Sequence, residues 1–235
     1  MGGAAPPVDG AGNVFVATGN GSSCSPTSPY DNSDSVLELE LSVSMKVVGR
    51  FAPPLFRNEN CHDRDLGSGA PQLLSFGALL QIGKTHHGYL LRPPLLGCVG
   101  ARPNSFFVCP GGQANGGDAV ISQSATKAVL AIPCSGGLQG ATMFATGATL
   151  SGGVIWMASV ATGPPILAAG SLVGIEPGLG GGSLDVINPS NGHVRLSRSI
   201  GPVTNHFDTP AAGEGLLVVA TAGSVYAIRP TIAGG

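Results

Sequence analysis

The sequence has few charged side chains. Only 10% of its 235 residues are charged, and 11 Lys and Arg against 13 Asp and Glu give a formal net charge of -2. Binding of nucleic-acid phosphates needs clustered Lys and Arg side chains, and no stretch of this sequence supplies them. The composition therefore predicts a protein that does not bind nucleic acid.

The sequence also lacks the spacing of apolar residues that is typical of an amphipathic helix. Residues 128–175 contain no charged side chain, so a membrane-spanning helix has to be considered. Gly163, Pro164 and Pro165 lie in the middle of its most apolar part and would break such a helix. We therefore predict strands separated by a turn here, and no membrane span.

Targeting and metal motifs are missing as well. The N-terminal stretch MGGAAPPVDG has neither a basic region nor an apolar core, so it does not resemble a secretory signal peptide. Five cysteines without CxxC spacing fit neither a dense disulfide scaffold nor a zinc site. His86 and His87 are adjacent, so on a strand they face opposite sides and cannot share one metal ion.

Glycine, proline and short apolar runs are abundant instead. The chain contains 38 Gly and 19 Pro, yet 43% of its residues are hydrophobic, which favours many short strands joined by turns. The apolar runs lie near residues 14, 79, 129, 172 and 217. Their spacing of roughly 40 to 65 residues is close to that of propeller blades. We predict an all-β partial β-propeller of about four to five antiparallel blades, with a β-sandwich as the alternative.

Two stretches resemble a known repeat family. LDVINPSNGHV and NHFDTPAAGEGLLVVAT are similar to the repeated blade motif and the blade opening of the quinoprotein-type, PQQ-binding-like β-propellers. The segments VDGAGNVFVATGNG, DRDLGSGAPQLL and GKTHHGYLL follow in the order seen in quinoprotein alcohol dehydrogenases. Only the later blades of that family are matched, and Leu196 stands where its motif has Trp. The resemblance implies one propeller domain over residues 1–235 that is truncated on its N-terminal side. Either the sequence is a fragment of a longer reading frame, or the ring is completed by pairing with a second copy.

The triplet GKT in QIGKTHHGYLL invites a comparison with phosphate-binding loops. A P-loop has four residues between its glycines, whereas five residues separate Gly77 from Gly83 and four of them are large or apolar strand formers, so we reject a nucleotide site. The family resemblance implies that Lys84 holds the quinone and stabilises charge on its oxygen. The alternative is a solvated lysine at the end of a strand.

The resemblance also implies roles for three other residues. Asn20 corresponds to a calcium ligand, and Asp65 corresponds to the general base beside that calcium ion. Asn205, at the start of NHFDTP, is assigned to the cofactor. Asn20 has an alternative role in a turn, and Asp65 has one in an Asx turn or cap. The family's second metal-binding carboxylate, vicinal cysteines and quinone-stacking Trp belong to earlier blades, which the matched region does not include.

Four cysteines are candidates for disulfides. Cys109 and Cys134 lie in consecutive strand-like segments separated by a loop, and Cys24 and Cys61 lie in the two loops that carry Asn20 and Asp65. Cys98 would then be unpaired, and we expect it to be buried. Such bridges, together with the resemblance, predict an extracellular or periplasmic protein.

Two functions of different class follow from these observations. The first is a non-catalytic or incomplete propeller that serves as a scaffold for a protein or polymer partner, as similar propellers do in outer-membrane assembly. The second is a fragment of a PQQ- and calcium-dependent alcohol or polyol dehydrogenase. The absent cofactor-binding residues favour the first.

Overall fold

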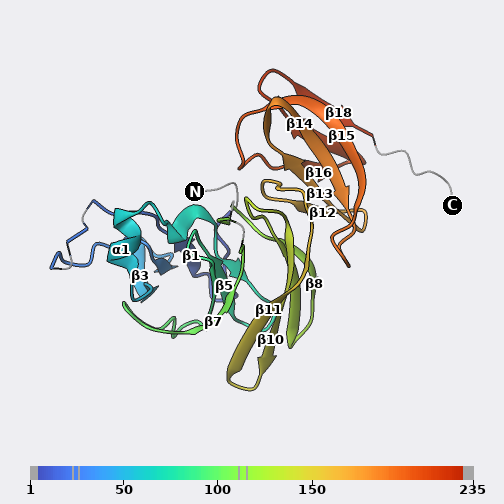
Figure 1. Ribbon diagram of the computed structural model, residues 1–235. Coiled ribbons are helices and arrows are strands. Elements are labelled where there is room, and N and C mark those ends of the chain that lie inside the picture. The colour runs from blue at the N-terminus through green and yellow to red at the C-terminus, as the bar shows by residue number, and fades with distance from the viewer. Residues whose placement is uncertain (1–4, 23, 26, 111, 115, 230–235) are drawn as a thin grey trace.

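The computed structural model describes residues 5–22, 24–25, 27–110, 112–114 and 116–229, and its regular structure is nearly all β-strand (Figure 1). In chain order the strands are β1 Val14–Ala17, β2 Val36–Glu40, β3 Lys46–Phe51, β4 Gln72–Leu73, β5 Leu79–Ile82, β6 His87–Leu91, β7 Asn104–Phe107, β8 Ala119–Gln123, β9 Lys127–Ile132, β10 Gln139–Thr146, β11 Thr149–Met157, β12 Ile166–Ala168, β13 Ser171–Glu176, β14 Gly178–Ile187, β15 Val194–Val203, β16 Ala211–Gly213, β17 Leu216–Ala220 and β18 Val225–Ile228.

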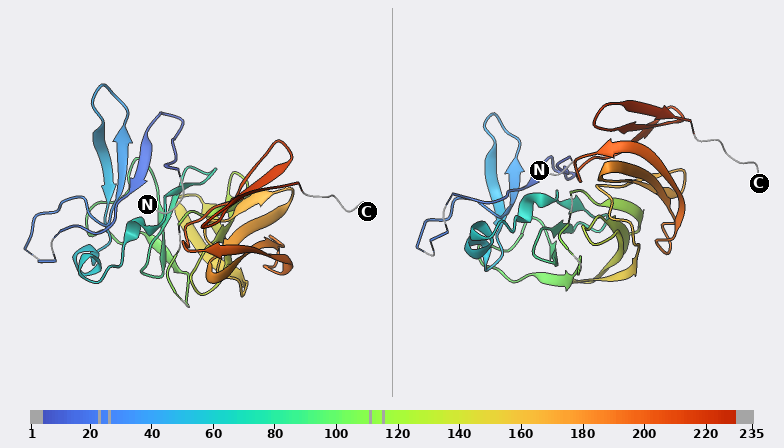
Figure 2. Two further views of the ribbon diagram at one scale, coloured as in Figure 1. Left: turned by 90° about the horizontal axis from the view of Figure 1, so that it is seen from above. Right: turned by 45° about the horizontal axis from the view of Figure 1, so that its top comes forward.

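These strands form five antiparallel sheets, and each sheet is a meander of consecutive strands. We name them blade 1 (β1–β3), blade 2 (β4–β7), blade 3 (β8–β11), blade 4 (β12–β15) and blade 5 (β16–β18). The blades follow one another along an arc (Figures 1 and 2). This is the partial β-propeller that the sequence predicts, and the β-sandwich alternative is wrong because a sandwich has two packed sheets.

The apolar runs seen in the sequence occupy equivalent places in the blades. Four of them lie in the second strand of blades 2 to 5, namely β5, β9, β13 and β17, while the run near residue 14 forms β1. Val14 of β1 also pairs with Val8 in an isolated β-bridge, so Val8 occupies the place of a first strand in blade 1. The apolar runs therefore recur along the sequence at the spacing of the blades.

Each pair of consecutive blades is joined by its own buried apolar cluster. Strand β5 illustrates the arrangement: Leu79 packs into the cluster shared with blade 1, whereas Leu80 and Ile82 pack into the one shared with blade 3. Strand β13 does the same, with Leu172 facing blade 3 and Val173 facing blade 5. Alternate side chains of a strand point to opposite faces, so strands buried on both faces become continuously apolar.

The uncharged region 128–175 forms strands, as predicted. It includes most of β9, all of β10, β11 and β12, and most of β13. The stretch QIGKTHHGYLL forms the β5–β6 hairpin, and the last two strands form the β17–β18 hairpin. Among the described residues, the structure has no helix long and apolar enough to cross a membrane.

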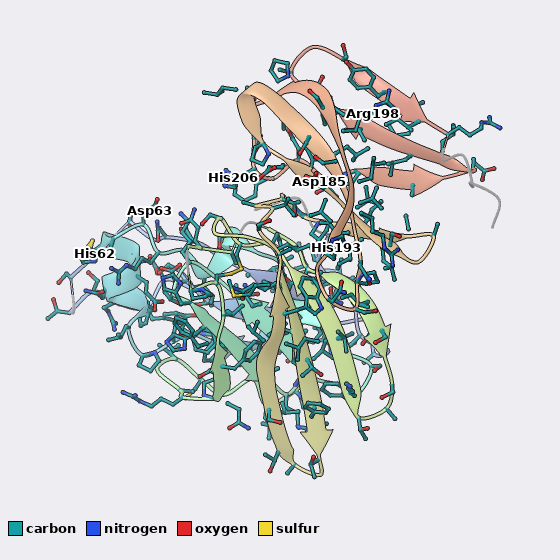
Figure 3. The ribbon with its side chains drawn as sticks, turned by 45° about the vertical axis from the view of Figure 1, so that its right-hand side comes forward. His62, Asp63, Asp185, His193, Arg198 and His206 are labelled. Carbon is teal, nitrogen blue, oxygen red and sulfur yellow. A yellow bond between two sulfur atoms is a disulfide. The ribbon has the colours of Figure 1, made fainter. Side chains whose placement is uncertain are left out.

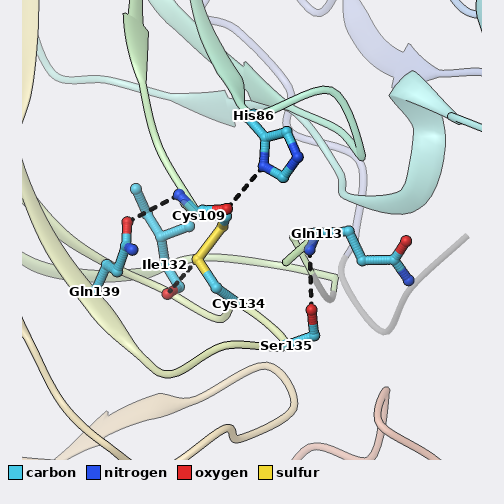
Figure 4. Close-up of a disulfide and its surroundings, with 7 residues drawn as sticks. All are labelled: His86, Cys109, Gln113, Ile132, Cys134, Ser135 and Gln139. Carbon is cyan, nitrogen blue, oxygen red and sulfur yellow. Dashed lines mark hydrogen bonds between the residues drawn. A yellow bond between two sulfur atoms is a disulfide. The ribbon is translucent and has the colours of Figure 1, made fainter. Parts of the chain in front are cut away.

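Both predicted disulfides are present. Cys109 and Cys134 follow β7 and β9 and link blade 2 to blade 3, with 5.3 Å between their Cα atoms (Figure 4). Cys24 and Cys61 are joined as well. Cys98 is free, as expected, but it is exposed, so its predicted burial is wrong. It lies in the loop after β6 rather than within a strand, where the cores between blades would enclose it.

One short α-helix was not predicted. Helix α1, Phe56–Cys61, follows β3, and the 3-10 helix η1, Leu66–Ser68, comes shortly after it. A helix of six residues is too short to show a repeating apolar pattern in the sequence. Together these two helices shape the loop that carries Asp65.

Candidate functional site

Three loop segments meet beside α1. They are the β1–β2 loop with Asn20, the segment between α1 and η1 with Asp65, and the β5–β6 turn with Lys84. The Cys24–Cys61 disulfide ties the first of these to the end of α1. Gln81 of β5 is fully buried and donates a hydrogen bond of 2.8 Å to the carbonyl of Leu66, which holds η1 over blade 2.

Close backbone contacts explain the glycines in TGNG and IGKT. A Cβ atom at Gly19 would lie 2.9 Å from Oδ1 of Asp65, and one at Gly83 would lie 2.6 Å from the carbonyl oxygen of Asp65. The backbone N–H of Lys84 donates to that same carbonyl at 3.0 Å. Gly83 is therefore required because the β5–β6 turn lies directly against Asp65.

Four polar side chains form one cluster here. Nζ of Lys84 lies 2.6 Å from Oδ2 of Asp65 and 3.1 Å from Oδ1 of Asp63. The backbone N–H of Asn20 donates to Asp65 at 2.9 Å, and its side-chain amide donates to Asp63 at 3.0 Å. We call Asn20, Asp63, Asp65 and Lys84 the polar cluster. The structure thus brings Asn20, Asp65 and Lys84 together.

Asp63 was missed in the sequence, although its position two residues before Asp65 in HDRD is a signal for it. Its carboxylate joins Asn20 to Lys84, and the hydrogen bond from Lys84 lowers the pKa of Asp63. Partial burial disfavours the charge of Lys84, but the hydrogen bonds to Asp65 and Asp63 outweigh it and raise the pKa of Lys84. The cluster is therefore an ion pair at neutral pH.

The arrangement can be tested against the calcium ion and quinone that the resemblance implies. A calcium ion takes six to eight oxygen ligands. Both carboxylate oxygens of Asp65 already accept hydrogen bonds, one from Asn20 and one from Lys84. Among the described residues, no group of three or more His, Cys, Asp or Glu side chains could hold a metal ion. As folded, the polar cluster fits an internal ion pair rather than a calcium site.

Asn205 lies elsewhere in the chain, in the loop between β15 and β16. Its Oδ1 accepts a hydrogen bond of 2.9 Å from the backbone N–H of Phe207, which is the geometry of an Asx turn. Within the described part of the chain, Asn205 makes no hydrogen bond to the polar cluster. Figure 3 shows its neighbour His206 beside blade 4 and Asp63 beside α1.

Two buried carboxyl groups lie behind the polar cluster, and no sequence motif marks them. Asp34 is fully buried, and one of its oxygens accepts the backbone N–H of Leu66 at 2.9 Å. Burial raises its pKa to about 6. Glu59 of α1 is only 5% exposed, and burial together with the charge of Asp34 raises its pKa to about 7. One oxygen of each carboxyl group has no hydrogen-bond partner.

A cavity of about 550 Å³ lies between α1 and the β5–β6 turn. Its wall includes Glu59 and Tyr89, together with the basic side chains of Arg64, Lys84 and Arg102. Sequence reasoning missed this cavity because its lining comes from four separate segments of the chain, which only the fold brings together. Lys84 therefore borders both the polar cluster and the cavity.

Comparison with known proteins gives the fold. No protein-family model matches the chain, and no curated protein matches it in sequence. The crystal structure of BamB from Moraxella catarrhalis is similar, with a TM-score of 0.56 and 13% identity over 94% of this chain and 56% of that one. The β-propeller domain of Cps50 (Swd1) from Myceliophteria thermophila has a TM-score of 0.51 and 14% identity, over 80% of this chain and 56% of that one.

The chain thus spans little more than half the length of these two structures. At such low identity the similarity carries no information about ligands or partners. The narrower assignment to the PQQ-binding-like repeats has no support from a family model. What the structure and its neighbours together establish is a β-propeller fold.

Proposed function

We propose that this chain is a non-catalytic propeller scaffold that binds a protein or polymer partner. The observation that carries the proposal is the polar cluster, in which Asp65 and Lys84 hold each other through an ion pair of 2.6 Å. These are the two residues to which the family resemblance gives catalytic roles. Because the carboxylate of Asp65 and the ammonium group of Lys84 neutralise each other, we infer that the pair holds two loops together.

An exposed apolar hairpin offers a surface for such a partner. Leu41, Val43 and Met45 lie at the tip of the β2–β3 hairpin, and each is more than half exposed. Figure 2 shows this hairpin projecting from the rest of the molecule. Clustered apolar side chains on a soluble surface are typical of sites that bind other proteins. The tip is therefore our candidate contact with a partner protein.

A photo-crosslinking experiment tests this role. We expect a photoreactive residue at Val43 to capture a specific protein in extracts of the source cells. The same residue at Ala125, in the exposed β8–β9 turn, is the matched control and should capture none. Changing Leu41 and Met45 to Ser should abolish the Val43 crosslink. Equal crosslinking at the two positions would refute the proposed contact.

A second candidate function is a fragment of a PQQ- and calcium-dependent alcohol or polyol dehydrogenase. It is favoured by the gathering of Asn20, Asp65 and Lys84 at one place. In that reading Asp65 is the base, Asn20 a metal ligand, and Lys84 and Asn205 contact the quinone. It requires Lys84 to release Asp65 before a metal ion binds.

Titration with PQQ and calcium separates the two functions. The scaffold proposal predicts neither bound-quinone absorbance nor dye-linked alcohol oxidation. Saturable PQQ binding that needs calcium, and that Lys84→Ala abolishes, would instead favour the dehydrogenase fragment. A melting curve of each protein shows that a loss of binding is not a loss of folding.

A further inference from the structure

The wall of the cavity beside α1 contains two arginine side chains. In the described part of the chain, the guanidinium groups of Arg64 and Arg102 form no ion pair and no hydrogen bond. Both side chains are exposed, so they can move toward a ligand. Lys84, in contrast, is already paired with Asp63 and Asp65. Two free guanidinium groups in one cavity wall favour an anion, and their forked donors match a carboxylate.

The same wall holds an unpartnered carboxyl group. Glu59 is 5% exposed, and its Oε2 has no hydrogen-bond partner. Leaving a buried polar group unpaired is costly, so such an atom marks a place where a ligand can supply the missing partner. Close to Glu59, the buried ring of Tyr89 also lines the cavity, and burial raises the pKa of its hydroxyl group to about 12.

These features select one kind of ligand. A carboxylate can accept hydrogen bonds from the two arginines, and a hydroxyl group can donate one to Glu59. A phosphate carries a second negative charge, which Glu59 would repel. The cavity volume of about 550 Å³ is within the usual range for small-molecule sites. We propose that this cavity binds a small hydroxycarboxylate of the sugar-acid type, with Arg64 and Arg102 on its carboxylate and Glu59 on a hydroxyl group. The proposal goes beyond the scaffold role and does not rest on it.

Calorimetric titration with three probes tests the ligand class. The wild-type protein should bind D-glucuronate saturably. D-glucose lacks the carboxylate and inorganic phosphate lacks the sugar hydroxyls, so each should bind at least about tenfold more weakly. Absence of glucuronate binding at about 1 mM, or equal binding of glucose or phosphate, would overturn the proposal.

Matched variants test the site. Arg64→Gln and Arg102→Gln remove charge from exposed side chains and should each weaken glucuronate binding about tenfold, because a charge-assisted hydrogen bond is lost. Arg198→Gln is the control, since Arg198 is an exposed arginine on β15 of blade 4, away from α1 (Figure 3). Binding that survives in the double variant Arg64→Gln, Arg102→Gln would place the ligand elsewhere and overturn the proposal. A missing crosslink at Val43 would leave this result unaffected.

Discussion

At the scale of single residues, burial decides the chemistry near α1. Glu59 and Asp34 are both enclosed by the loops that meet beside blade 1, and each keeps one oxygen without a partner. Burial disfavours the charged form of a carboxyl group and raises the pKa of both, and the charge of Asp34 raises the pKa of Glu59 further. Arg64 acts in the opposite direction on Glu59 but does not compensate for burial.

Because burial raises the pKa of Glu59 and Asp34, we expect the free energy of unfolding to fall as the pH rises. The pKa of Glu59 rises from 4.5 to about 7 on folding, so its contribution is complete below pH 4.5 and is lost as the pH rises to about 7. The loss in the free energy of unfolding should reach at most about 3 kcal/mol. Asp34 contributes in the same direction at slightly lower pH.

Chemical denaturation of Glu59→Gln between pH 4 and pH 8 measures this contribution. The variant carries a neutral side chain of similar size, so its free energy of unfolding should depend less on pH than that of the wild type. Glu40→Gln changes an exposed glutamate and serves as the control. Parallel pH profiles for Glu59→Gln and the wild type would contradict the prediction.

At the scale of elements, loops after strands carry the links between blades. Cys109 and Cys134 are almost fully buried, and the carbonyl of Cys109 accepts a hydrogen bond from His86 while its N–H donates to Gln139 (Figure 4). The disulfide therefore lies in a network that joins the end of blade 2 to blade 3.

Short apolar runs and turns could be predicted from sequence because each depends on neighbouring residues alone.

Removing this disulfide should destabilise the protein. The variant Cys109→Ala, Cys134→Ala opens a covalent loop of 25 residues and should lower the free energy of unfolding by about 3 kcal/mol. Cys98→Ala, which changes the exposed free cysteine, should have little effect. Thermal melts under non-reducing conditions compare the three proteins. Equal melting temperatures for the double variant and the wild type would contradict the expectation.

At the scale of the whole molecule, stability is built from contacts between neighbouring blades. In the described part of the chain, each buried cluster joins two consecutive blades, and none joins blade 1 to blade 5. Blade 3 is therefore covered on both faces, whereas blade 5 contributes to one cluster only. Its outer face includes Val218 and Val225, which are partly or largely exposed.

Hydrogen exchange should reveal this gradient. Amides of β17 and β18 should exchange faster than those of β9 and β10, because a sheet covered on one face opens at lower cost than one covered on both. Mass spectrometry of peptides from each blade provides the measurement. Uniform protection across blades 3 and 5 would mean that the chain unfolds as a single cooperative unit.

The sequence by itself determined the class of fold, the approximate number of blades, the strand positions and both disulfides. The fold class, the number of blades and the strand positions depend on local patterns, namely alternating burial and glycine and proline turns. The two cysteine pairs were inferred from the strand-like segments and loops in which they lie. It also pointed to Asn20, Asp65 and Lys84 through their resemblance to a family.

Only the tertiary structure decided what surrounds those three residues. The joining carboxylate of Asp63, the buried Glu59 and the cavity with Arg64 and Arg102 come from segments that are separate in the chain. Burial and charge depend on distances between such segments, and no local pattern encodes them. The same is true of Cys98, whose exposure follows from the path of its loop outside the cores between blades.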